Sequence, residues 1–299
     1  MASLKDELTK RLKENRPQLS DKSIKTYIST LSNLPKKLNA TDKPINIKWY
    51  DDNALNILNF LQEEVANKRK SVLSALYILT KNEDIHETMI EDAKFVNDKY
   101  KQQRMSENEK DNWIDWKDVL AKHNALKSAA NSIFKKKMLT EDDFFELNKF
   151  MLLSCFVYLP PRRVMDYALM MTRNFTKEDN YITKGNITFN QYKTAKQFGS
   201  QTFPIPKEFN DYIKKWIKIN TTDYLIISTT YKPVTSSQTT KLLNAIFGKN
   251  ISSDMLRHSY LTNYYSGTMP PLTEMEELGR KMGHSVATQL TYIKRDTPS

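Results

Sequence analysis

The sequence predicts a mainly α-helical protein with one small antiparallel β-sheet, arranged as two domains. The 299 residues are enough for about two domains of ~100–200 residues each. All six glycines lie at or after Gly185, and the long stretch before it carries apolar residues at helical spacing. After Met171 apolar and polar residues alternate instead, which is typical of strands. The helical part therefore comes first, and the sheet belongs to the second domain.

The N-terminal domain, residues 1–104, is predicted to be entirely helical. In its second helix Ile24, Ile28 and Leu31 fall on one face at three- and four-residue spacing, so that face packs into a core. Ser20 and Asp21 precede this helix as candidate caps. The predicted helices are Leu4–Glu14, Lys22–Leu38, Asp52–Ala66, Ser71–Lys81 and Met89–Lys101.

A polar stretch separates the two domains. Residues Lys101–Trp113 lack apolar periodicity, and we assign the linker to residues 105–113. Residues 114–299 form a mixed domain whose short strands lie near Tyr181–Ile182, Ile187–Gln191 and Gln201–Ile205. Its predicted helices are Trp116–Phe134, Glu141–Tyr158, Glu208–Ile219, Ser236–Phe247, Ser253–Ser266, Thr273–Lys281 and Val286–Lys294.

Composition excludes several classes of protein. A formal net charge of +11 favours a polyanionic partner such as nucleic acid. The single Cys155 excludes a disulfide framework, and one Cys with four scattered His makes a structural zinc site implausible. No apolar run reaches the ~20 residues that span a bilayer, and the charged N-terminus does not look like a signal peptide. We expect an intracellular protein without a membrane partner, found wherever its polyanion lies.

Common catalytic motifs are absent, but three segments of the second domain stand out together. They are LPPRRVMDY at 159–167, DMLRHS at 254–259, and LGRKMGHS at 278–285 followed by Tyr292. Their order and spacing resemble the active-site boxes of the tyrosine recombinase, or phage-integrase, superfamily. The resemblance implies a helical core-binding domain followed by a mixed α+β catalytic domain. The abundance of Lys, Asn and Ile is compatible with a virus or a mobile element.

The resemblance implies a role for each matching residue. Tyr292 would be the nucleophile that forms a covalent phosphotyrosine. Arg163 and Arg257 would bind the non-bridging phosphate oxygens, a task that suits a planar, permanently charged guanidinium. Arg162 is the alternative to Arg163, and Asp166 completes the Arg-x-x-acid pattern.

The remaining positions of the pattern are His284, a lysine and the residue three before Arg257. His284 would donate a hydrogen bond to the phosphate, and Lys193 or Lys196, in a β-hairpin turn, would protonate the leaving oxygen. Asp254 stands where the family has His or Lys, and could orient an arginine or take the tyrosine proton. His258 would be a buried structural residue. No metal or cofactor is implied, because these cations supply the positive charge.

The function implied is that of a site-specific DNA recombinase or integrase. It would cut and rejoin double-stranded DNA through 3′-phosphotyrosyl intermediates, as a homo-tetramer on paired sites. The alternatives are a type IB topoisomerase, which shares this chemistry but acts as a monomer, and a catalytically inactive DNA-binding protein of the same fold. A helical scaffold unrelated to nucleic acid would leave the three segments as coincidence.

Overall fold

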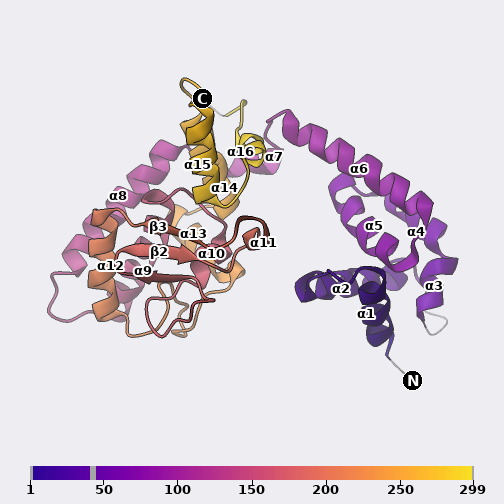
Figure 1. Ribbon diagram of the computed structural model, residues 1–299, viewed down its shortest axis with the longest axis horizontal. Helices are drawn as coiled ribbons and strands as arrows, with labels where there is room; N and C mark the ends of the chain where they lie inside the picture. The colour runs from indigo at the N-terminus through magenta and orange to yellow at the C-terminus, as the bar shows by residue number, and fades with distance from the viewer. Residues whose placement is uncertain (1–2, 41–44, 298–299) are drawn as a thin grey trace. The chain divides into compact units, whose positions relative to one another are not determined.

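The computed structural model describes residues 3–40 and 45–297, and the chain divides into two compact units, Met1–Gln102 and Gln103–Ser299 (Figure 1). Each unit has its own hydrophobic core. Within the described residues no helix is both long and apolar enough to cross a membrane.

The first unit is helical, as the apolar spacing predicted. The predicted face of α2 is buried, with Ile24, Ile28 and Leu31 each under 8% exposed. The Ser20 side chain accepts a hydrogen bond from the Ser23 amide and caps this helix. The helices are α1 (Leu4–Asn15), α2 (Asp21–Lys37), α3 (Ile47–Asp52), α4 (Ala54–Phe60), a 3₁₀ turn (Leu61–Glu63), α5 (Ala66–Thr80) and α6 (Glu83–Lys101).

One predicted helix of this unit is wrong. The stretch Asp52–Ala66 is not continuous, because Asn53 ends α3 and a 3₁₀ turn follows α4. The Asn53 side chain donates to the Trp49 carbonyl at 2.9 Å, which satisfies an end-of-helix acceptor. Apolar periodicity continues across this break, so the pattern alone did not reveal it.

The second unit contains the predicted small sheet. Its strands β1 (Tyr181–Thr183), β2 (Asn186–Phe189) and β3 (Gln201–Pro204) pair antiparallel in that order, with Ile187 opposite Phe203. The helices are α7 (Glu107–Asn112), α8 (Trp116–Ile133), α9 (Glu141–Val157), α10 (Val164–Ala168), α11 (Ala195–Phe198), α12 (Lys207–Ile219), α13 (Ser236–Phe247), α14 (Ser253–Tyr264), α15 (Leu272–Met282) and α16 (Val286–Tyr292).

The segment predicted as a linker, 105–113, folds as part of the second unit. It contains α7, which begins with a reciprocal capping box between Ser106 and Glu109. Met105 and Trp113 are buried in the core of the second unit. The apolar pattern is too sparse to predict a helix here, and the groups that hold the segment come from the far end of the chain.

Candidate active site

Three separate stretches of the second unit meet at one site. The two residues before α10 are arginines, α14 contributes Asp254 and Arg257, and the α15–α16 region contributes His284 and Tyr292. The structure therefore brings together residues that are more than 100 positions apart in the sequence.

Arg257 is the centre of the site. It is fully buried, and its Nη1 donates to Asp254 Oδ1 at 3.1 Å and to the Tyr292 hydroxyl. Its Nη2 lies 2.8 Å from His284 Nδ1, and its guanidinium carbon lies 4.1 Å from the centre of the Tyr292 ring. A buried guanidinium is unfavourable unless it is paired. In the described part of the chain the carboxylate bonded to Arg257 is that of Asp254, which is 65% exposed, so the site is well suited to receive an anion.

The tautomer of His284 follows from its bond to Arg257. An arginine only donates, so Nδ1 of His284 accepts and the proton of the neutral ring is on Nε2. Burial lowers the pKa of His284 to about 3, and the charges of Arg257, Arg163 and Arg162 add to this effect. Nε2 is buried without a partner among the described residues. His284 is therefore a neutral donor at neutral pH with its N–H available.

Gly283 explains part of the sequence around this histidine. It ends α15 with φ of +69°, a conformation that favours glycine. A Cβ at this position would lie 2.7 Å from Nη2 of Arg162. Glycine thus allows the chain to turn toward His284 while it passes close to a buried arginine.

Tyr292 is the last residue of α16. Its hydroxyl accepts from Arg257 and lies 3.4 Å from Asp254 Oδ1, to which it donates. Burial raises the pKa of Tyr292, and Arg257 opposes that rise. Nδ1 of His258 lies 2.6 Å from the Tyr292 carbonyl oxygen, and the two rings are 4.7 Å apart. His258 therefore supports the backbone of Tyr292.

The two neighbouring arginines have different surroundings. Arg162 is 1% exposed, and it donates to Asp166 at 2.8 Å, to the Gln201 side chain at 3.0 Å and to the Lys281 carbonyl at 2.7 Å. Burial raises the pKa of Asp166 while Arg162 opposes the rise. The acid of the Arg-x-x-acid pattern is therefore bonded to Arg162, four residues before it.

Arg163 is only half-buried. Its Nη1 lies 3.4 Å from the Gly283 carbonyl, and its charge acts on His284 and Tyr292. Of the two arginines, Arg163 has the more accessible guanidinium beside the predicted nucleophile.

Lys193 and Lys196 both lie in the β2–β3 connection and are exposed. The Thr194 hydroxyl donates to the Gly283 carbonyl at 2.7 Å, so this loop is attached next to His284. The choice between the two lysines stays open. Among the described residues no group of three or more His, Cys, Asp or Glu is arranged to hold a metal ion.

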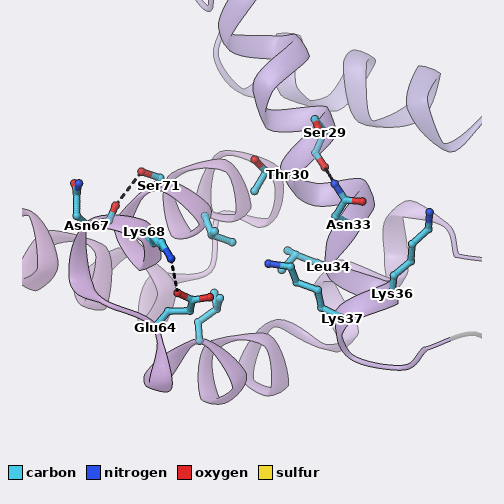
Figure 2. Close-up of a pocket in the computed structure, with 12 residues that line it drawn as sticks. Ser29, Thr30, Asn33, Leu34, Lys36, Lys37, Glu64, Asn67, Lys68 and Ser71 are labelled. Carbon is cyan, nitrogen blue, oxygen red and sulfur yellow. Dashed lines mark hydrogen bonds and ion pairs between the residues drawn. The ribbon is translucent and has the colours of Figure 1, made fainter. Parts of the chain in front are cut away.

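The first unit carries a separate groove of about 570 Å³ that is lined by both polar and apolar side chains. Figure 2 shows that Lys37 from α2 reaches into the space between the helices, and that Lys68 from α5 is paired with Glu64, at 3.9 Å. Lysine, serine and asparagine side chains are those that contact phosphates and base edges.

Sequence comparison finds no matching protein-family model and no matching curated protein. Solved structures are similar, however. A lambda integrase dimer bound to a COC′ core site matches with a TM-score of 0.52 at 16% identity, over 97% of this chain and 77% of that one. A lambda integrase tetramer bound to a Holliday junction matches with a TM-score of 0.50 at 14% identity, over 98% and 79%. XerA recombinase matches with a TM-score of 0.43 at 14% identity, over 97% of this chain and 94% of that one.

The likeness to lambda integrase shows that the chain has the tyrosine-recombinase fold. The predicted fold class, a mainly helical protein with a small antiparallel sheet, is thereby confirmed. Identities of 14–16% show the fold alone, so the case for an activity depends on the site residues.

Sequence reasoning missed Glu109 and Lys294. Lys294 Nζ lies 2.7 Å from Glu109 Oε1, and the lysine side chain is 4% exposed. The Ser-x-x-Glu capping signature at 106–109 could have predicted α7. No local signal could have paired it with the other end of the chain.

Proposed function

We propose that this chain is a DNA strand transferase of the tyrosine type, acting as a site-specific recombinase or integrase. The observation that carries the proposal is the contact of the Tyr292 hydroxyl with Arg257 and Asp254, beside the free Nε2–H of His284. A nucleophile, a base and buried cationic donors at one point are the groups that phosphodiester cleavage requires.

In the proposed reaction the Tyr292 oxygen attacks the phosphorus and the bond from phosphorus to the 5′-oxygen breaks. Asp254 takes the tyrosine proton, and Lys193 or Lys196 gives a proton to the 5′-oxygen. Arg163, Arg257 and His284 stabilise the charge on the non-bridging oxygens. The product is a 3′-phosphotyrosine and a free 5′-hydroxyl, and attack by a 5′-hydroxyl reverses the step without ATP.

Double-stranded DNA is the proposed substrate, and a homo-tetramer on paired sites is the proposed assembly. The groove between α2 and α5 supports DNA binding by the first unit, since Lys37 reaches into it and Lys36 and Lys68 line it. The net charge of +11 acts in the same direction.

The test uses the full-length protein and supercoiled plasmids that carry candidate sites, without Mg²⁺. After an SDS quench, protein covalently attached to a 3′-phosphate is measured. We expect the wild type and Tyr264→Phe, a matched control on α14, to form the adduct, and Tyr292→Phe to form none while it still binds DNA. Binding without an adduct at any site would favour the inactive DNA-binding protein, and relaxation by monomers would favour the topoisomerase.

A further inference from the structure

Residues 103–109, here called the connecting segment, hold the chain on both sides of Tyr292. Figure 1 shows α7 of this segment beside α16, although nearly the whole second unit separates them in sequence. The Gln103 side chain donates to the Leu290 carbonyl at 2.7 Å, and the Arg295 amide donates to the Gln103 carbonyl at 3.0 Å. The Met105 amide donates to Asp296 Oδ1 at 2.8 Å.

The strongest of these contacts is the ion pair between Glu109 and Lys294. Lys294 Nζ lies 2.7 Å from Glu109 Oε1 and 3.2 Å from the Arg104 carbonyl. The other Glu109 oxygen accepts from the Ser106 amide at 2.8 Å. Because Lys294 is almost fully buried, loss of the carboxylate would leave an uncompensated charge there.

The same carboxylate also lies near His258, the residue that supports the Tyr292 backbone. Glu109 Oε1 lies 3.5 Å from Nε2 of His258, whose Nδ1 donates to the Tyr292 carbonyl. A carbonyl only accepts, so Nδ1 carries the proton. Nε2 of this neutral ring can only accept, so it makes no hydrogen bond with the Glu109 carboxylate. Glu109 therefore holds the chain beside Tyr292 through Lys294, two positions after the tyrosine.

This anchoring matters because α16 ends at Tyr292. The next residue, Ile293, is extended with φ of −63° and ψ of 135°, so the helix does not continue past the nucleophile. The Lys294 amide donates to the Thr262 hydroxyl at 2.9 Å, which fixes the other side of this turn. The direction of the tyrosine ring thus depends on contacts made outside its own helix.

We propose that Glu109 is a positioning residue for Tyr292: it anchors Lys294, two positions after the tyrosine, and so sets where the tyrosine oxygen lies relative to Arg257 and Asp254. The inference rests on the proposed function of Tyr292 as the nucleophile. A displacement of about 1 Å in a reacting group can cost about 100-fold in rate. Glu109 would act through that displacement and not by contact with DNA.

The first experiment compares Glu109→Gln with Glu107→Gln in the full-length protein. Glu107 lies on the same helix but is 87% exposed and pairs with Lys110, so it is a matched control. We expect Glu109→Gln to slow adduct formation at saturating DNA by about 10- to 100-fold. DNA affinity should stay within about twofold, and Glu107→Gln should behave as the wild type. An equal loss of affinity and rate would indicate a general structural role and overturn the proposal.

The second experiment asks whether Glu109 acts through Lys294. Lys294→Met alone should slow the adduct as Glu109→Gln does, and the double variant should be no slower than either single one, because residues that act as one unit are not additive. Additive losses would contradict the proposed route.

Amide hydrogen exchange separates this inference from the proposed function. Without DNA, Glu109→Gln should speed exchange at the Arg295 amide, and Glu107→Gln should not. If exchange is faster in Glu109→Gln but even the wild type forms no adduct, the nucleophile role of Tyr292 is refuted, and the positioning role of Glu109 with it. Unchanged exchange together with a wild-type adduct rate would overturn the positioning and leave the proposed function standing.

Discussion

Arg162 and Arg163 show how two identical side chains, adjacent in sequence, acquire different tasks. Arg162 is enclosed by Asp166, Gln201 and the rings of Phe189 and Tyr192, with its guanidinium carbon 4.1 and 4.7 Å from the two ring centres. Arg163 is the N-cap residue just before α10 and stays half-buried beside the site. Arg162 therefore ties α10 to the sheet and to α15, and Arg163 is left partly accessible for its proposed contact with a phosphate.

This difference gives a prediction for the two alanine variants. Arg162→Ala leaves the buried Asp166 without its partner and should cost about 3–5 kcal/mol of unfolding free energy. Arg163→Ala should leave the unfolding midpoint nearly unchanged and slow adduct formation by about 10²–10³-fold. Urea unfolding and the adduct assay on the same preparations would check both. The opposite result, a stable Arg162→Ala protein without activity, would exchange the two roles.

The β2–β3 connection is the element that carries both candidates for the general acid. It is attached to the site through Thr194 and Gly283, and it carries Lys193 and Lys196 on its exposed side. Only a lysine that protonates the leaving oxygen becomes dispensable when that oxygen no longer needs a proton.

We predict that Lys193→Ala slows cleavage of ordinary DNA by about 10²–10⁴-fold, the usual contribution of a general acid. DNA with sulfur in place of the 5′-bridging oxygen should be cleaved at nearly the wild-type rate, because a thiolate leaves without protonation. Lys196→Ala is the matched variant from the same loop. Rescue by sulfur in Lys196→Ala, and not in Lys193→Ala, would assign the acid to Lys196.

On the scale of the whole molecule, two buried histidines link stability to pH. Burial lowers the pKa of His123 to about 4, and that of His284 to about 3. Both values lie below the usual ~6.5 of an unfolded chain. At pH values between the pKa of each folded histidine and the unfolded value of ~6.5, the unfolded chain binds protons that the folded chain does not. The stabilisation is therefore complete above about pH 6.5 and is lost as the pH falls.

Between pH 7 and pH 5 each of these histidines should reduce the unfolding free energy by about 2 kcal/mol. Urea titrations followed by tryptophan fluorescence suit the measurement, since three of the four tryptophans lie in the second unit with both histidines. His123→Gln and His284→Gln should each reduce the pH dependence by about 2 kcal/mol, and His258, whose pKa burial also lowers, contributes to what is left. A wild-type protein equally stable at both pH values would contradict the buried, neutral state of the two rings.

Much of the architecture follows from local features of the chain. Three features each reflect a local requirement of the backbone. They are the apolar stripe of α2 with its Ser20 cap, the alternation at Ile187–Phe189 and the glycine before His284. Such features act over a few residues, so they can be found in one sequence. The break at Asn53 and the helix at 107–112 were missed because the apolar pattern is misleading or weak there.

The amino-acid pattern was enough to predict the mainly helical fold class, the small antiparallel sheet and the set of candidate residues. It could not predict that Arg162, and not Arg163, is bonded to Asp166, or that Glu109 pairs with Lys294, which is 185 positions later in the chain. The physical reason is burial: which charged groups lose water, and which partner then compensates them, depends on contacts between segments far apart in the chain.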